Sequence, residues 1–508
     1  MKAFTEPLLS LAGFEEMTKT AEKSSGLISV TGCIDAQKSQ MIYAFGGHRK
    51  NKLIVTFGEQ KAKELYDEYS FFDKEVVYYP SKDVLFYQSD IRGNLLTAER
   101  IRALKAIHEQ ERVTLVTTFD ALMNTMAPIE KMWENVLTLE QGQLLDLKEI
   151  QAALIRMGYE KEYQVQTMGQ FSVRGGILDV FPLTEENPIR IELWGDEIDT
   201  IRYFDCESQK SIENIDRVSI YPAAELVLSD EEKAGGIDKL KAEAKRVSDK
   251  LRKQMKTEEA HRVTVMADEL IEEWGELSMY AGMDAFLSYF FDERVGLLDY
   301  FNPSDSLIFF DELTRCTEQG KLTETEFSES MKQRLAMGYI LPGQMNGLFT
   351  EKEIVAKLEK YSCIALAALD NKANGLHQLG SYGIHCQSVS PYNNSFELLI
   401  KDLKRYKKNG YRVILLSGSR TRAKRLSEDI TDQGITCFYT ENYDHELFEG
   451  QIMVCYGKVR RGFEYPILKF AVITESDIFG AQQKKKKRHR TYEGEKIQSF
   501  TDLSVGDY

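Results

Sequence analysis

Residues 171–182 read Phe-Ser-Val-Arg-Gly-Gly-Ile-Leu-Asp-Val-Phe-Pro, and this stretch decides how the middle of the chain folds. Its two glycines, Gly175 and Gly176, permit backbone torsions and close approaches that a residue with a Cβ atom resists. An alternating apolar strand over 177–181 follows them directly and is closed by Pro182. The stretch therefore predicts the start of a small β-sheet.

The segment that follows, 188–205, predicts a β-hairpin. Its two arms, 189–194 and 197–204, are joined by Gly195 and Asp196, a two-residue loop of the kind that favours a primed turn. Together with the preceding strand, the hairpin predicts a small antiparallel sheet.

Side chains on the first arm of this hairpin alternate between two faces. Ile191 and Leu193 share one face, and Arg190, Glu192 and Trp194 share the other. The aliphatic face predicts core, which leaves an arginine and a tryptophan facing outward. Both residue types are enriched at hot spots of protein interfaces, so this face indicates a surface that binds a partner. The alternative is that Trp194 packs under a helix.

The composition limits the class of protein. At 508 residues the chain predicts three or four domains, and 43% apolar with 29% charged residues is ordinary for a globular protein. No run of about 18 apolar residues offers a membrane span, the N-terminus lacks a signal-peptide pattern, and the seven cysteines are scattered. We therefore expect a cytoplasmic protein without membrane contact. A net charge of −15 means that any contact with DNA must come from a local patch.

The first 125 residues alternate short β-branched strands with helices, which is the pattern of a doubly wound α/β domain. Helices are predicted near 59–70 and 97–109. The predicted strands lie at 27–30, 53–57, 76–79 and 114–118.

A sequence similar to a phosphate-binding loop follows the first of these strands. From Gly32 to Ser39 the spacing is that of G-x-x-x-x-G-K-[ST], with Lys38 as the lysine, but Gln37 replaces the second glycine. That glycine lets consecutive backbone N–H groups wrap a phosphate, and a glutamine adds bulk where the phosphate would lie. We interpret the loop as a degenerate nucleotide site, although Lys38 and Ser39 at a helix N-terminus keep the chemistry to bind an anion.

A second element of a nucleotide site comes much later in the chain. Residues 307–312 form an apolar run that ends in Asp311 and Glu312, as in a Walker B element, where the aspartate holds magnesium and the glutamate activates water. Such runs also occur at ordinary strand ends, so the interpretation is structural unless a working phosphate loop faces them. The alternative is that these two acids, with Lys38 and Ser39, form an ATPase with an unusual loop.

The chain between 227 and 370 predicts a long charged helix and then more α/β structure. The helix runs from 229 to about 259, and strands follow at 306–310 and 363–367.

From residue 371 a further α/β unit is predicted, with strands at 411–416, 451–456 and 470–474 and a basic helix over 420–432. Its order of strand, turn and helix is similar to the second RecA-like lobe of helicases. Its dense cations suggest a positive face for nucleic acid, and an ordinary solvated face is the alternative. These cations are Lys404, Arg405, Lys407, Lys408, Arg412, Arg420, Arg422, Lys424 and Arg425. The run 484–490 after this unit is too charged to pack and predicts a linker or an interaction tail, which would attract DNA, RNA or an acidic protein alike.

Taken together, these features resemble the N-terminal half of the bacterial transcription-repair coupling factors (Mfd). The first 370 residues also resemble modules of the excision-repair protein UvrB, which itself keeps an intact phosphate loop. The motifs that carry the resemblance are the loop at 32–39, Arg174-Gly-Gly-Ile-Leu-Asp-Val-Phe-Pro182, Phe310-Asp-Glu312, Gly462-Phe463 leading to Val472-Ile-Thr-Glu475 with Phe479-Gly480, and Leu503-Ser-Val-Gly-Asp-Tyr508.

The resemblance implies a fold and a domain order. The fold is a degenerate, phosphate-loop-derived RecA-like lobe of three layers, interrupted by a small antiparallel β-rich domain and followed by a second RecA-like α/β domain. The implied domains are 1–143 and 227–370 for the two parts of the UvrB-like lobe, 144–226 for the inserted UvrA-binding domain, 371–480 for a small α/β domain, 481–498 for a basic linker, and 499–508 for the start of a truncated domain that binds RNA polymerase.

The resemblance also implies a function in transcription-coupled nucleotide excision repair. The UvrB-like module would recruit UvrA to stalled RNA polymerase without hydrolysing ATP, through residues carried over by motif onto Arg174, Arg190 and Trp194. ATP, Mg²⁺ and duplex DNA would belong to missing motor domains, which form an ATP-dependent DNA translocase that displaces RNA polymerase. The alternative is a UvrB-related ATPase or DNA-binding module acting on its own.

Overall fold

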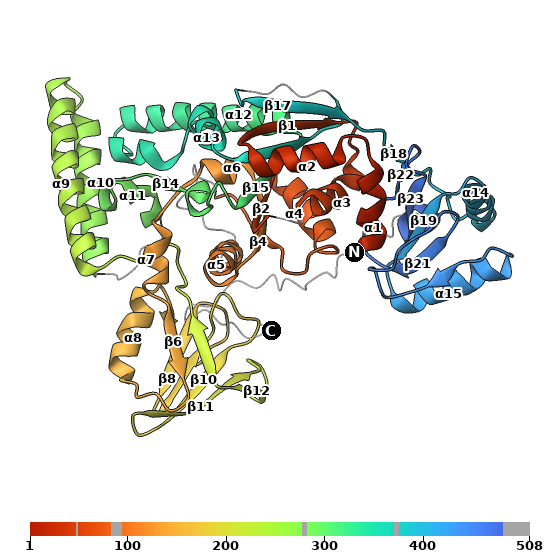
Figure 1. The fold of residues 1–508 in the computed structure, drawn as a ribbon. Helices are drawn as coiled ribbons and strands as arrows, with labels where there is room; N and C mark the ends of the chain where they lie inside the picture. Colours follow the sequence, from red (N-terminus) through yellow and green to blue (C-terminus); the bar gives the residue numbers. More distant parts are fainter. Residues whose placement is uncertain (47–48, 83–93, 277–281, 370–374, 481–508) are drawn as a thin grey trace, which may run out of the picture.

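The computed structural model describes residues 1–46, 49–82, 94–276, 282–369 and 375–480 (Figure 1). The predicted linker at 481–498 and the predicted domain start at 499–508 lie outside these ranges. None of the helices in the described ranges is long and apolar enough to cross a membrane.

The first unit is a seven-stranded sheet in which all neighbouring strands run parallel. Its strands are β1 (Gly26–Thr31), β2 (Asn51–Thr56), β3 (Val77–Tyr79), β4 (Val113–Thr118), β15 (Ser306–Asp311), β16 (Ser362–Leu366) and β17 (Gln378–Gly383). They are arranged in the order β17-β1-β16-β15-β2-β4-β3. All six strands that the sequence predicts here are present to within two residues, and the α/β class is confirmed.

Helices cover both faces of this sheet, so its strands are buried on both sides and carry continuous apolar runs. The helices of the unit are α1 (Lys2–Thr5), α2 (Phe14–Lys23), α3 (Asp35–Phe45), α4 (Glu59–Tyr69), α5 (Asn94–Glu109), α6 (Phe119–Met123), α12 (Leu313–Ala336) and α13 (Glu351–Leu358). Helices α1 to α4 share a core with Ile28 and Ile54, whereas α5, α6, α12 and α13 share one with Leu53 and Leu115. The layers are therefore helix, sheet and helix.

A second sheet projects from this unit at the lower left of Figure 1. Its strands are β7 (Glu160–Lys161), β8 (Gln170–Arg174), β9 (Ile177–Val180), β10 (Ile189–Trp194), β11 (Glu197–Phe204) and β12 (Ser211–Ile215). They follow one another as β12-β11-β10-β9-β8-β7, and every pair except β7 with β8 is antiparallel. The predicted antiparallel sheet is confirmed. Helix α8 (Leu147–Arg156) and the pair β6 (Leu137–Glu140) and β13 (Arg217–Ile220) complete its core.

The two glycines of the opening stretch form the turn between β8 and β9. Gly175 has a φ of +61°, in the left-handed region, and a Cβ atom on Gly176 would lie 3.1 Å from the carbonyl oxygen of Leu193. The stretch is therefore a whole hairpin and not only the start of a sheet.

The charged helix predicted from 229 to about 259 is two helices, so that prediction is wrong beyond Lys253. Helix α9 (Asp230–Lys253) begins at a capping box of Ser229 and Glu232, and α10 (Thr257–Glu276) returns antiparallel beside it (Figure 1). Met255, with a φ of +64°, turns the chain between them. The apolar stripe of α9 packs against α10, so this part is a helical hairpin rather than the start of α/β structure.

The third unit holds a six-stranded mixed sheet in the order β18-β22-β23-β19-β21-β20. Its strands are β18 (Gln387–Ser388), β19 (Arg412–Ser417), β20 (Phe438–Tyr439), β21 (Ile452–Tyr456), β22 (Phe463–Tyr465) and β23 (Phe470–Thr474). Helices α14 (Phe396–Lys408) and α15 (Arg420–Asp432) cover one face. The other face shares a core with α1, since Ile414, Met453 and Val472 cluster with Phe4 (Figure 1).

Short elements complete the described structure: β5 (Thr125–Met126), α7 (Ile129–Trp133), α11 (Leu287–Phe290), β14 (Val295–Gly296) and α16 (Glu475–Phe479).

Candidate protein-binding face and degenerate nucleotide site

The loop that resembles a phosphate-binding loop is short. Helix α3 begins at Asp35, so Gln37, Lys38 and Ser39 lie inside its first turns. The backbone N–H of Gln37 donates to the carbonyl oxygen of Ile34, and the Gln37 side chain is fully buried. This N–H group is therefore already paired within the protein and is not open to a phosphate.

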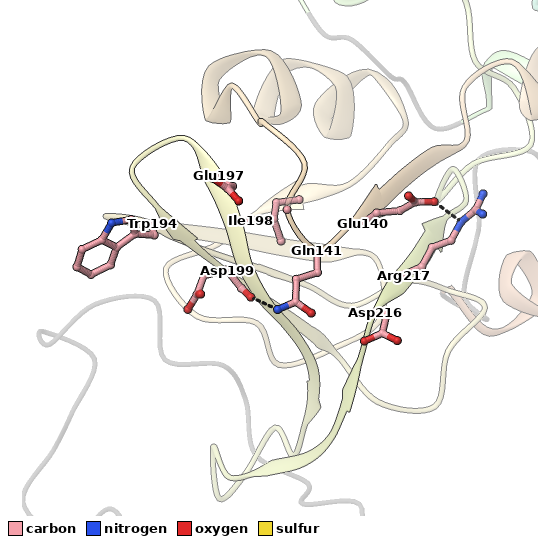
Figure 2. A pocket seen from close by; sticks show the side chains of 9 residues that line it. Glu140, Gln141, Trp194, Glu197, Ile198, Asp199, Asp216 and Arg217 are labelled. Atoms are coloured by element: carbon pink, nitrogen blue, oxygen red, sulfur yellow. Dashed lines mark hydrogen bonds and ion pairs between the residues drawn. The ribbon is translucent and has the colours of Figure 1, made fainter.

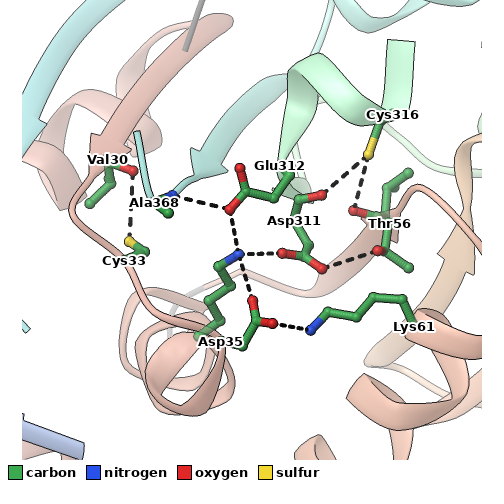
Figure 3. A network of polar contacts seen from close by, with 11 residues as sticks. Val30, Cys33, Asp35, Thr56, Lys61, Asp311, Glu312, Cys316 and Ala368 are labelled. Carbon is green, nitrogen blue, oxygen red and sulfur yellow. Dashed lines mark hydrogen bonds and ion pairs between the residues drawn. The ribbon is translucent and has the colours of Figure 1, made fainter. Parts of the chain in front are cut away.

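The Lys38 side chain contacts the carboxylates of Asp311 and Glu312 at the end of β15. Figure 3 shows these two carboxylates beside that of Asp35. The Nζ of Lys38 lies 2.5 Å from Oδ1 of Asp311, 2.8 Å from Oε1 of Glu312 and 3.2 Å from Oδ1 of Asp35. Thr56 donates a further hydrogen bond to Oδ2 of Asp311 at 3.1 Å. The Lys38 and Asp311 side chains are each 1% exposed. Burial lowers the pKa of Lys38, but attraction to Asp311 and Glu312 outweighs it, and the pKa lies well above the usual value.

All six predicted residues of the degenerate site are thus gathered at the carboxyl ends of β1 and β15. The lysine that would hold a phosphate and the aspartate that would hold Mg²⁺ are bound to each other. Gly32 makes a further close contact, because a Cβ atom there would lie 2.1 Å from the carbonyl oxygen of Ile384. Among the described residues, no group of histidine, cysteine, aspartate and glutamate is arranged to hold a metal ion.

The predicted partner-binding face is the outer face of strands β8 to β11. Trp194 is 83% exposed there, so the alternative that it packs under a helix is wrong. Beside it lies a hollow of about 620 Å³ (Figure 2), lined by the carboxylates of Glu197, Asp199 and Asp216. Strand β11 has one extra residue, Asp199, opposite the step from Glu192 to Leu193 on β10. The irregularity lies on β11, so alternation along β10 still places Trp194 on the same face as Arg190.

The two predicted arginines meet at a carboxylate that the sequence analysis missed. Asp179 on β9 is 1% exposed and accepts from Nη2 of Arg174 at 2.9 Å. It also accepts from Nε of Arg190 at 2.7 Å and from Nη2 of Arg190 at 2.9 Å. Arg190 is only 12% exposed, and its guanidinium carbon lies 4.4 Å from the centre of the Phe204 ring. Arg190 therefore lies on the outer face, as predicted, but Asp179 and the Phe204 ring hold its guanidinium group there and cover most of it.

The cations predicted to form a positive face on the third unit are partly neutralised. Arg405 pairs with Asp402 at 3.2 Å, and Arg420 pairs with Glu441 at 3.2 Å. Arg422 pairs with Glu475. Ion pairing of this kind is typical of a solvated surface, which weakens the interpretation as a nucleic-acid site.

Residues 137–226 match the UvrB interaction domain. The match contains β6, β13 and all six strands of the second sheet, including Arg174, Asp179, Arg190 and Trp194. The predicted resemblance to modules of UvrB is thereby confirmed for these residues, which include all of the predicted inserted domain at 144–226.

Longer similarity runs over nearly the whole chain. The chain is 28% identical over 458 residues to the transcription-repair-coupling factor of Bacillus subtilis, covering 90% of this chain and 38% of the relative. It is 28% identical over 493 residues to that of Staphylococcus haemolyticus, covering 95% and 41%, and 27% identical over 506 residues to that of Staphylococcus aureus, covering 97% and 42%. The predicted resemblance is confirmed, and the chain spans about two fifths of the length of these curated relatives.

Proposed function

We propose that this chain is a recruitment module of transcription-coupled nucleotide excision repair, and that the outer face of its second sheet binds UvrA. The observation that carries the proposal is Trp194, which is 83% exposed on a sheet that also presents Arg174. A large, rigid aromatic side chain gives contact area at little entropic cost, and arginine binds carboxylates in a bidentate way. The match of 137–226 to the UvrB interaction domain supports this choice of surface.

We further propose that the first unit is a RecA-like lobe that has lost ATP hydrolysis and that the third unit is a second RecA-like domain. The pairing of Lys38 with Asp311 at 2.5 Å supports the first part, because both charges are already neutralised inside the protein. The parallel strands β23, β19, β21 and β20 of the third unit support the second part.

The remaining activities are proposed for the longer family protein and not for this chain alone. They are binding to RNA polymerase, and ATP- and Mg²⁺-dependent translocation on duplex DNA. The similarity to relatives that are more than twice as long supports this division.

A calorimetric titration with UvrA tests the proposal. Trp194→Ala and Arg174→Ala should each weaken binding by about 1–3 kcal/mol, a factor of roughly 5 to 150, because each removes a side chain of a type enriched at interface hot spots. Met255→Ala is the control, since this side chain is 87% exposed but lies on the helical hairpin. Equal affinities for the original protein and for both variants of the face would contradict the assignment of UvrA to this surface.

A further inference from the structure

The two arginines on the outer face of the second sheet do not have the same surroundings. Arg190 donates hydrogen bonds from Nε and Nη2 to the carboxylate of Asp179, and its Nη2 also donates to Oε1 of Gln209 at 2.8 Å. Arg174 uses only Nη2 on Asp179. The exposed fraction is 37% for the Arg174 side chain and 12% for the Arg190 side chain. Arg174 is therefore the arginine whose remaining donors are open to a partner.

We propose that Asp179 is a positioning residue that orients Arg174 toward an anionic group of the partner. Arg190 in turn holds the carboxylate of Asp179 in place. The inference rests on the proposed function of this face. A guanidinium group has five N–H donors in a rigid fork, so the single bond from Nη2 to Asp179 restricts the orientation of Arg174 and leaves Nε–H, both Nη1–H groups and one Nη2–H for a second carboxylate. The partner group that fits is an aspartate or glutamate side chain.

The backbone supports this arrangement from both sides. Asp179 pairs with Ser172 on β8 and with Arg190 on β10, so its side chain stands between the two arginines on the same face. The contact with the Phe204 ring restricts the position of the Arg190 guanidinium group.

Charge and entropy both favour a carboxylate at this point. Two arginines against one aspartate leave one positive charge, which a single partner carboxylate would neutralise. A long arginine side chain normally loses rotamer freedom when it binds, and the bond to Asp179 restricts Arg174 before the partner arrives. Asp179 would therefore raise affinity without touching the partner.

The test is a double-mutant cycle of Asp179→Asn and Arg174→Ala, with binding to UvrA measured by calorimetry. Asp179→Asn keeps the size of the side chain but removes the charge that attracts Arg174. We expect it to weaken binding about tenfold in the original protein and less than twofold when Arg174 is already alanine. Asp402→Asn is the matched control, because Asp402 also pairs with an arginine, Arg405 at 3.2 Å, but lies on helix α14 of the third unit; its affinity should stay within twofold.

Thermal melting of each variant separates positioning from folding. If Asp179→Asn does not fold, Arg190→Lys replaces it, since lysine keeps the charge but cannot bind Asp179 through two nitrogens. A tenfold loss that persists in the Arg174→Ala background, or no loss at all, would overturn the positioning role. If Arg174→Ala and Trp194→Ala both leave the affinity unchanged, the proposed function itself fails, which is a different result from failure of Asp179 alone.

Discussion

Replacing Lys38 with methionine should destabilise the first unit strongly. Methionine keeps the length of the side chain but removes the charge that faces Asp311 and Glu312. Removing one partner of a buried ion pair leaves an uncompensated charge and costs about 3–5 kcal/mol. The upper part of this range applies if Asp311 stays ionised. Its side chain is 1% exposed, and without Lys38 its carboxylate keeps the hydrogen bond from Thr56.

Urea denaturation at pH 7 measures this effect. Lys61→Met is the matched control. Its Nζ pairs with Asp35 at 2.9 Å, but that carboxylate is 70% exposed, so the loss should stay below about 1 kcal/mol. If the two variants lose the same stability, the pairing of Lys38 with Asp311 does not stabilise the site.

Three further predictions concern stability. Burial raises the pKa of Glu225, but the positive charges of Arg100 and Lys82 outweigh burial and lower this pKa to about 2. The ionised carboxylate therefore contributes its full stabilisation above pH 5, and urea unfolding should show a loss of about 2 kcal/mol between pH 5 and pH 3 that Glu225→Gln lacks. Burial raises the pKa of Glu68 to about 7, so its ionisation costs stability as pH rises from about 4.5 to 7; Glu68→Gln should stabilise the protein by about 2–3 kcal/mol at pH 8 and by almost nothing at pH 4 in the same assay. Gly32→Ala should lower the stability, measured by thermal melting, by about 2–5 kcal/mol, because Gly32 has a positive φ and an added Cβ atom would clash with the backbone of Ile384. Gly434→Ala is the control: Gly434 has a φ of +76° but open space around it, so the loss should be only about 1–2 kcal/mol.

Much of the fold follows from local sequence signals. The hairpin of β10 and β11 is predicted to the residue, because Gly195-Asp196 fixes the turn and alternation fixes the faces. The break between α9 and α10 is not predicted, because the chain turns at Met255 and neither glycine nor proline marks the position.

The contacts within the two candidate sites are harder to predict from the sequence. The pairing of Lys38 with Asp311 joins residues 273 positions apart, and only the parallel order of β1, β16 and β15 brings them together. Alternation along β9 places Asp179 on the face opposite the core, so the sequence does contain a signal for this residue. Its meaning depends on the register of β9 between β8 and β10, which sequence pattern alone does not give.

The order of strands in the first sheet also sets the order in which the chain can fold during synthesis. Strand β1 ends at Thr31, but its neighbours β16 and β17 begin at Ser362 and Gln378. A ribosome that adds about 5–20 residues per second needs roughly 20 to 70 s to make the intervening chain. The second sheet has all its strands within 160–215 and needs no later segment to pair them. The surface with Trp194 can therefore form before the strands that flank the apolar strand β1 have been made.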